Sequence, residues 1–174
     1  MQTDKRAFMP LSIAILTVSD TRTPETDRSG QVLADSVTET GHVIADRRIV
    51  PDDIYLIRAV VSEWIVTPSV HVIVTTGGTG VTGRDGTPEA LSALFDKTLE
   101  GFGEIFRAIS LSEIGTSTIQ SRALAGVANG IYIFCLPGSQ NACRTAWNQI
   151  IRHQLDYRTR PCNLVELMPR LLEK

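Results

Sequence analysis

The chain alternates between short apolar runs and segments with helical spacing. Residues 11–18 (LSIAILTV) are nearly all apolar or β-branched, as is typical of a strand covered on both faces, and the polar residues 19–28 follow. Apolar positions over 32–37 then recur at helical spacing, with Ser29 as candidate N-cap and Gly41 as C-terminal stop. This pattern predicts one strand followed by one helix.

The same alternation continues along the chain. A second strand is expected over 42–50, a helix opened by Pro51-Asp52-Asp53 runs through Trp64, and a third strand covers 70–76 (VHVIVTT). The remaining predicted elements are a helix with Thr87 as N-cap and Pro88 at its first position, a helical stretch from 101–103, a buried strand over 131–136, a turn at 137–139, a helix over 142–155 and a short helix over 165–172.

Repeated strand and helix alternation predicts an α/β fold. The expected architecture is a doubly wound, mostly parallel sheet with helices on both faces. The length of 174 residues is that of one ordinary domain, and no linker or repeat divides residues 1–174. One domain is therefore expected.

Composition narrows the classes of function. With 43% hydrophobic residues, 21% charged residues and a net charge of −2, the chain has no strongly basic face, which argues against a nucleic-acid partner. It has no run of 18 apolar residues and no signal-peptide pattern at its start, so neither a membrane nor export is expected. Three cysteines without CxxC spacing favour a reducing compartment, the cytoplasm, and scattered histidines give no zinc pattern.

In such sheets ligands bind beyond the carboxyl ends of the strands, so the loops after Val18, Val50, Thr76 and Leu136 are the places to search. The segment 75–85 (TTGGTGVTGRD) combines glycine amides, threonine hydroxyls and one guanidinium. These groups suit a phosphate.

Two familiar phosphate motifs do not fit this loop. Gly78, Gly80 and Gly83 match the spacing of a dinucleotide fingerprint, but they follow the third strand, and their helix begins only near Pro88. A Walker-type loop is excluded because no lysine occurs between residues 5 and 97. A connecting turn without function stays as the alternative.

Two carboxylates flank the expected crevice. Asp85 ends the glycine-rich loop and Asp52 follows the second strand, so both can converge on one edge of the sheet. Nucleotidyl transfer needs a hard cation, and Mg²⁺ favours one or two carboxylates plus phosphate oxygens and water. A helix cap is the alternative role for Asp52, whereas Thr87 leaves no such role for Asp85.

Several blocks of sequence carry a family resemblance. In this order and spacing, the blocks resemble the molybdenum-cofactor biosynthesis B / molybdopterin adenylyltransferase family, which includes the gephyrin G domain. The resemblance covers almost the whole chain, with residues 1–10 as an N-terminal extension. The blocks are Thr75-Thr-Gly-Gly-Thr-Gly80, Arg84-Asp85, Thr87-Pro-Glu-Ala90, Gly101-Phe-Gly-Glu104, Ser121-Arg122 and Leu136-Pro-Gly138.

The resemblance implies a three-layer α/β fold that assembles as a homotrimer or, by pairing of trimers, a homohexamer. It also implies an activity: binding of molybdopterin, transfer of AMP from MgATP to its terminal phosphate, and release of pyrophosphate. Molybdopterin and ATP would be the substrates, Mg²⁺ the assisting cation, and the molybdenum insertion protein a candidate partner.

The resemblance assigns roles to individual residues. Asp85 matches the catalytic aspartate, Asp52 matches the supporting aspartate after the second strand, and both are candidates for holding Mg²⁺ through the phosphates. The candidate pterin-phosphate and pterin contacts are Thr76, Gly77, Gly78, Thr79, Gly80, Glu104, Ser121, Pro137, Gly138 and Ser139. The candidate nucleotide contacts are Ser19, Asp20, Ser29 and Gly30.

The sequence departs from the family at one position, and two other functions remain as alternatives. The family usually has valine after the loop aspartate, whereas Gly86 here adds backbone freedom beside Asp85. A pterin carrier of the same fold that performs no chemistry is the main alternative. A scaffold for other cofactor proteins is the third, and it would have no affinity for nucleotides.

Overall fold

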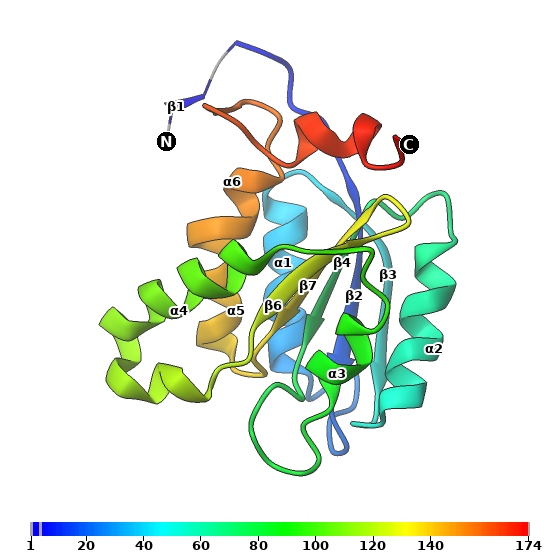
Figure 1. Ribbon diagram of the computed structural model, residues 1–174, viewed down its shortest axis with the longest axis vertical. Coiled ribbons are helices and arrows are strands. Elements are labelled where there is room, and N and C mark those ends of the chain that lie inside the picture. Colours follow the sequence, from blue (N-terminus) through cyan, green and yellow to red (C-terminus); the bar gives the residue numbers. More distant parts are fainter. Residues whose placement is uncertain (1, 4, 174) are drawn as a thin grey trace.

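A six-stranded sheet forms the centre of the computed structural model, which describes residues 2–3 and 5–173. Its strand order is β3-β2-β4-β7-β6-β5 (Figure 1). The first four strands in that order run parallel, and β6 and β5 are each antiparallel to the preceding strand. The strands are β2 Ser12–Val18, β3 Val43–Val50, β4 Val72–Thr76, β5 Lys97–Thr98, β6 Leu124–Ala128 and β7 Ile131–Leu136.

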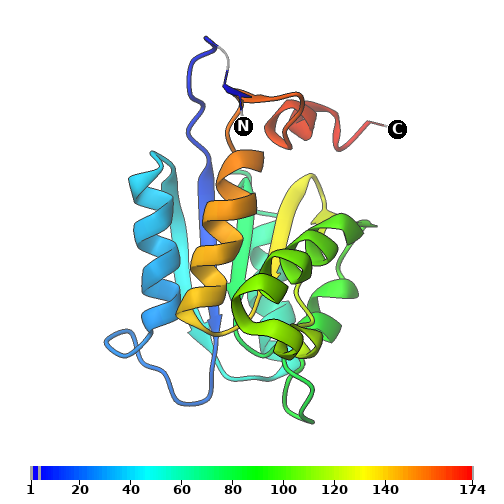
Figure 2. The ribbon, with the colours of Figure 1, turned by 90° about the vertical axis from the view of Figure 1, so that its left-hand side faces the viewer.

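Helices cover both faces of the sheet (Figures 1 and 2). Alternate residues of each central strand face opposite sides: Ile13 and Ile15 belong to one hydrophobic core, while Ala14 and Leu16 belong to the other. The first core contains residues of α1 Arg28–Glu39, α4 Glu100–Ile114 and α5 Gln140–Ala146, and the second contains residues of α2 Ile54–Ile65 and α3 Thr87–Ser92. The three-layer, mostly parallel α/β fold is therefore confirmed.

The order of the strands also confirms the double winding. From β2 the chain passes through α1 to β3, and then through α2 back across β2 to β4. The direction of winding reverses between β2 and β4, which makes the carboxyl ends of these two strands a topological switch point. Loops from both halves of the fold meet there.

Two predicted helix starts are wrong. Helix α1 begins at Arg28 and is capped by Asp27, which accepts a hydrogen bond from the Gly30 amide, so Ser29 is not the cap. Helix α3 has Gly86 in the cap position, and the hydroxyl of Thr87 donates instead to the Gly77 carbonyl at 2.9 Å. At α3 the contact with Gly77 takes the Thr87 hydroxyl away from the capping position, and at α1 the cap Asp27 is also held by Thr17 and Arg47.

The C-terminal third differs from the expected pattern in detail. The helix predicted over 142–155 begins at Gln140, capped by Ser139, and is interrupted by a π-helical turn (η2, Trp147–Ile151) before α6 (Arg152–Gln154). The last predicted helix is a 3₁₀ segment (η3, Val165–Arg170), and a further 3₁₀ segment, η1, covers Gly115–Gln120. Strands β5 and β6 were not predicted.

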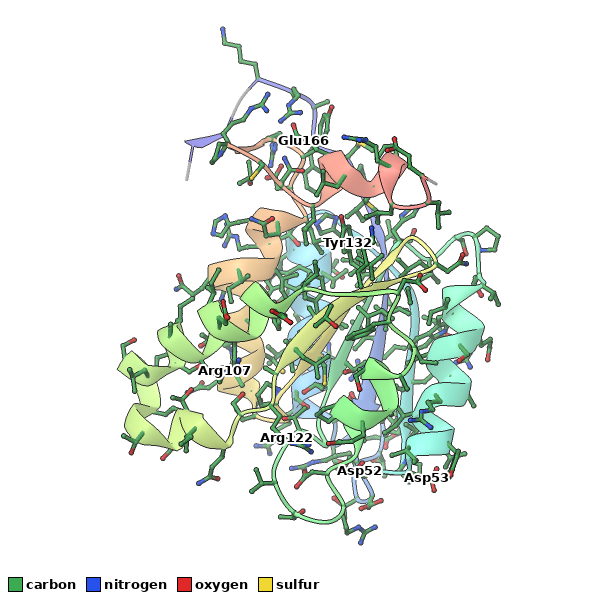
Figure 3. The ribbon with its side chains drawn as sticks, viewed as in Figure 1. Asp52, Asp53, Arg107, Arg122, Tyr132 and Glu166 are labelled. Atoms are coloured by element: carbon green, nitrogen blue, oxygen red, sulfur yellow. The ribbon has the colours of Figure 1, made fainter. Side chains whose placement is uncertain are left out.

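The N-terminal and C-terminal segments of the described residues both lie at the amino end of the sheet (Figures 1 and 2). Strand β1 (Gln2–Thr3) pairs with β8 (Thr159–Arg160), and Glu166 accepts hydrogen bonds from the guanidinium groups of Arg6 and Arg160. The Tyr132 hydroxyl donates to the Leu164 carbonyl, which fixes the C-terminal segment to the sheet (Figure 3). Among the described residues, no helix has the length and apolar character needed to span a membrane.

Candidate functional site

Four adjacent parallel strands place their following loops at one edge of the sheet. Strands β3, β2, β4 and β7 are neighbours, so segments 19–27, 51–53, 77–86 and 137–139 lie at the same end of the molecule, opposite the two termini (Figure 1). This is the end at which open α/β sheets bind ligands. The four loops that sequence reasoning selected are therefore brought together.

The glycine-rich loop leaves β4 through two residues that only glycine suits. Gly77 has φ +102° and Gly78 has φ +63°. A Cβ atom on Gly77 would lie 2.2 Å from the Val18 carbonyl oxygen, and one on Gly78 would lie 2.6 Å from a carboxylate oxygen of Asp52. The loop backbone thus passes directly against the end of β2 and against Asp52.

Asp52 is available for a role other than capping. The neighbouring Asp53 caps α2 by accepting hydrogen bonds from the amides of Tyr55 and Leu56, at 2.8 and 3.0 Å. The carboxylate of Asp52 accepts a 3.2 Å hydrogen bond from the Gly86 amide instead. The capping alternative for Asp52 is therefore excluded.

The carboxyl groups around Asp52 oppose its ionisation. Partial burial, together with the negative charges of Asp85 and Asp20, raises the pKa of the Asp52 carboxyl above its ordinary value. A hard divalent cation between Asp52 and Asp85 would relieve this repulsion, so the donor set suits Mg²⁺ completed by phosphate oxygens and water. Among the described residues, no group of three or more histidine, cysteine or acidic side chains forms a complete metal site.

Asp85 is held inside its own loop. Its carboxylate accepts hydrogen bonds from the Thr82 hydroxyl at 2.6 Å and from the Thr82 amide at 2.9 Å. These bonds, the hydroxyl first, and a further one from the Gly80 amide lower the pKa of Asp85. Asp85 is therefore ionised at neutral pH and fixed in direction.

The backbone of Gly86, the residue after Asp85, lies close to the start of α2. A Cβ atom at position 86 would stand 2.7 Å from the Cγ2 atom of Ile54. The valine usual in the family would require Ile54 to shift. The Gly86 amide is fixed by its bond to Asp52, which ties the loop to the end of β3.

Arg122 joins two points of the glycine-rich loop, Gly80 and Asp85. Its Nε atom donates to the Gly80 carbonyl at 2.7 Å, its Nη2 atom donates to the Asp85 carbonyl at 2.5 Å, and its Nη1 atom pairs with Glu89. Arg122, Asp52 and Asp53 lie at the same end of the molecule (Figure 3). Sequence reasoning gave Arg122 no role, since its acceptors are backbone carbonyls about 40 residues away that leave no local pattern.

A cavity of about 440 Å³ opens beside this loop. One wall consists of predicted substrate-binding residues and Asp85, and the other is formed by α4 and η1, with Ser110 and Glu113 among the residues that were not foreseen. The predicted residues that line the cavity are Gly78, Thr79, Gly80, Asp85, Ser121, Pro137, Gly138 and Ser139.

The remaining predicted substrate residues lie outside this lining. Thr76 is buried, and its hydroxyl donates to the Pro137 carbonyl at 3.0 Å, so it supports the wall from behind. The Gly77 amide donates to the Leu136 carbonyl. Glu104 is exposed on α4 and does not line the cavity, whereas Glu113 at the end of the same helix does.

A second cavity of about 480 Å³ lies at the ends of β2 and β3. It is lined by two of the predicted nucleotide residues, Ser19 and Asp20, together with Arg22 and Arg47. Asp20 accepts a hydrogen bond from the Asp52 amide at 3.2 Å and forms an ion pair with Arg84 at 2.7 Å. Asp52 therefore lies next to both cavities.

Ser29 and Gly30, the other two predicted nucleotide residues, do not line either cavity. The Gly30 amide donates to Asp27 at 2.9 Å, and the Asp27 carboxylate also accepts from the Thr17 hydroxyl and pairs with Arg47. This internal carboxylate already occupies the start of α1, where the sequence suggested a nucleotide phosphate.

The fold and this edge define a class: a doubly wound α/β protein whose glycine loop and paired carboxylates suit a phosphorylated ligand. Comparison with known proteins is more specific. The family model described as "Probable molybdopterin binding domain" matches residues 14–157. The chain belongs to this family, as the resemblance predicted, and its role lies in molybdenum cofactor biosynthesis.

Individual relatives agree with this assignment. Molybdenum cofactor biosynthesis protein B of Escherichia coli is 59% identical over 156 residues, covering 90% of this chain and 92% of the relative. The protein of the same name from Bacillus subtilis is 43% identical over 142 residues, covering 81% and 84%.

Solved structures show the same fold. A crystal structure of a molybdenum cofactor biosynthesis protein B superposes with a TM-score of 0.84 at 45% identity, covering 86% of this chain and 94% of that one. The tungsten cofactor synthesizing protein MoaB from Pyrococcus furiosus gives 0.73 at 38% identity, covering 81% and 90%.

Proposed function

We propose that this chain binds molybdopterin and transfers AMP from MgATP to the terminal phosphate of that pterin, releasing pyrophosphate. The observation that carries the proposal is the position of Asp52 and Asp85. Asp85 lines the cavity beside the glycine-rich loop, Asp52 contacts the backbone of Gly78 at the wall of that cavity, and the Asp52 amide binds Asp20 of the second cavity. Two substrates held in the two cavities would meet at these carboxylates.

The cavity beside the glycine-rich loop suits the pterin. Its loop wall offers the backbone of Gly78, Thr79 and Gly80, which can approach a phosphate closely. The second cavity suits the nucleotide, because Arg22 and Arg47 supply positive charge for a triphosphate, with Ser19 and Asp20 beside them. Ser29 and Gly30 are not part of this proposal.

The reaction needs little proton transfer. A phosphate monoester is largely dianionic near neutral pH, with a second pKa of about 6, so its oxygen can attack the α-phosphorus directly. The new bond joins that oxygen to the α-phosphorus, while the bond to the β-phosphate oxygen breaks and pyrophosphate leaves. Bound Mg²⁺ would supply charge neutralisation, and Asp52 and Asp85 would hold it and thereby orient the reacting phosphates.

The test is a coupled assay. Purified protein is incubated with molybdopterin and MgATP, and pyrophosphate release and adenylated pterin are followed together. Asp85→Asn and Asp52→Asn should each lower turnover by at least 100-fold, as expected when an electrostatic contact at the reacting centre is lost. Asp35→Asn is the matched control, because Asp35 is an exposed carboxylate on α1 that lines neither cavity.

Pterin binding separates the enzyme from a carrier. Wild type and Asp85→Asn should bind molybdopterin with similar affinity, since the loop wall stays in place. If both bind and neither releases pyrophosphate, the chain is a carrier without chemistry. If neither protein binds a pterin or a nucleotide, the chain is a scaffold and is neither an adenylyltransferase nor a pterin carrier.

We also propose that the chain works in the cytoplasm as a homotrimer or homohexamer, with the molybdenum insertion protein as candidate recipient of its product. Apolar side chains on α4 and η1 support self-association: Ile105 and Ile114 are each 53% exposed, and Ile119 is 83% exposed. Light scattering on the purified protein tests the assembly, and a monomer at micromolar concentration would contradict it.

A further inference from the structure

We propose that Glu113 selects the pterin ring by accepting hydrogen bonds from its amide N–H and 2-amino group. This inference rests on the proposed function, because it assumes that the cavity beside the glycine-rich loop takes a pterin. It assigns the recognition of the ring to a residue that neither the family resemblance nor the local sequence pattern indicated.

Glu113 lines the cavity from the last turn of α4, on the wall formed by α4 and η1, whereas the glycine loop and Asp85 form another wall. Asp85 and Glu113 are the two carboxylates of the lining. Asp85 is engaged by Thr82 in the loop that would receive the phosphate, which leaves Glu113 as the carboxylate for another part of the ligand.

The Glu113 carboxylate is held in a fixed orientation. The Thr145 hydroxyl on α5 lies 3.0 and 2.8 Å from the two carboxylate oxygens of Glu113. Thr145 is 8% exposed and packs between the helices, so it fixes the carboxylate from the protein side. One hydroxyl supplies one proton, while an ionised carboxylate can accept about four hydrogen bonds, so most of its acceptor capacity is left for a ligand.

The Glu113 carboxylate is complementary to the hydrogen-bond donors of a pterin ring. A 2-amino-4-oxopteridine presents the N3–H and the 2-amino group side by side, which are two parallel donors. A carboxylate accepts such a pair with both oxygens, and the bonds are strengthened by its charge. Ser110, Ser117 and Gln120 on the same wall can serve the remaining polar atoms of the ring.

Glu104 provides the matched comparison. It is a glutamate on the same helix, exposed and outside the cavity lining, and it was the sequence-based candidate for this role. If recognition depends on the cavity, replacing Glu113 matters and replacing Glu104 does not. Both positions are exposed on α4, so neither amide variant should prevent folding.

The experiment measures binding of soluble pteridines by fluorescence titration, with 6-hydroxymethylpterin and its phosphate as probes. The corresponding lumazines, which carry oxygen in place of the 2-amino group, are the comparison ligands. Wild type should prefer the pterin. Glu113→Gln should bind the pterin about 10- to 100-fold more weakly and bind the lumazine as well as or better than wild type, because its amide can donate to the new carbonyl.

The variants distinguish failure of the two proposals. Thr145→Val should weaken pterin binding less than Glu113→Gln, and Glu104→Gln should match wild type. If wild type prefers the pterin and Glu113→Gln keeps the same preference, the Glu113 proposal is overturned while the proposed function stands. If wild type binds neither the pterins nor the lumazines, the cavity is not a pterin site, and both proposals fail.

Discussion

Replacing the buried carboxylate of Asp27, which lines neither cavity, should make this protein easier to unfold. The Asp27 side chain has no exposed surface, and its two oxygens accept hydrogen bonds from the Gly30 amide at 2.9 Å, the Thr17 hydroxyl at 2.8 Å and Arg47 at 2.9 Å. Asp27→Asn removes the charge and turns an amide nitrogen toward these donors. A buried ion pair is thereby broken from one side.

The magnitude follows from these partners. Removing one member of a fully buried pair costs about 3–5 kcal/mol, and the 25% exposure of the Arg47 side chain lets water compensate in part. We expect the free energy of unfolding to fall by about 2–4 kcal/mol. For a domain of this length that corresponds to a loss of roughly 5–15 °C in Tm.

The effect has a defined pH window. Burial would raise the pKa of Asp27, but the bonds from Arg47, Gly30 and Thr17 outweigh it, so the pKa is lowered overall. A depressed folded-state pKa contributes stability above the unfolded value of about 3.9, and this stability is lost as pH falls through the folded value. The difference between wild type and Asp27→Asn should therefore be constant from pH 7 to pH 5.

Urea denaturation followed by circular dichroism, at pH 7 and pH 5, is the assay. Asp35→Asn on the exposed face of α1 is the control, and it should change stability by less than about 0.5 kcal/mol. A loss below about 1 kcal/mol for Asp27→Asn, or a loss that disappears by pH 5, would refute the view that this carboxylate holds the start of α1.

Three further predictions test the loop, its bonds to Arg122 and a buried histidine. Gly78→Ala should destabilise the fold by at least about 2 kcal/mol, because the φ of Gly78 is +63° and the new Cβ would stand 2.3 Å from the Thr87 hydroxyl. In thermal denaturation, Gly83→Ala should have the Tm of wild type, because its Cβ would meet open space. Arg122→Lys should lower the rate of pyrophosphate release by about 10- to 100-fold, since one ammonium group cannot reproduce the paired bonds to Gly80 and Asp85. Glu89→Gln keeps both bonds and should stay near the wild-type rate. Equal rates for all three proteins would show that these two bonds do not matter for the reaction. Burial lowers the pKa of His42 to about 4. Between pH 6.5 and 4 the unfolded chain therefore takes up a proton on His42 that the folded chain does not. The free energy of unfolding should fall by up to about 3 kcal/mol as the pH is lowered through that range. His42→Gln should flatten this pH dependence in urea titrations, and an unchanged slope would point to another group.

The elements that the sequence predicted well are those whose signal is contained within them. Strands β2, β4 and β7 are continuous apolar runs buried on both faces, and such runs can be recognised without knowledge of their neighbours. Strand β6 (LAGVA) escaped prediction because its small residues have weak strand preference, and it is formed by pairing with β7.

Helix starts were harder to predict because several candidate caps stand close together. Asp27 and Ser29, or Asp52 and Asp53, are equivalent on local rules, and the contacts of Asp27 with Thr17 and Arg47 decide the first case. In the second case Asp53 caps α2, which leaves the Asp52 carboxylate free to bond to the Gly86 amide. Because Asp27 takes the start of α1, Ser29 and Gly30 lie outside the cavity proposed for the nucleotide.

The sequence was enough to predict the α/β class, the four loops of the candidate site, the glycine loop with Asp52 and Asp85, and the family, because these depend on patterns and blocks that are local in the chain. The tertiary structure decided which of the candidate residues face a cavity, and it added Arg122 and Glu113. Their partners lie 32–42 residues away along the chain, at Gly80, Asp85 and Thr145. Hydrogen bonds between segments so far apart depend on how the layers pack, and no spacing rule in the sequence encodes that packing.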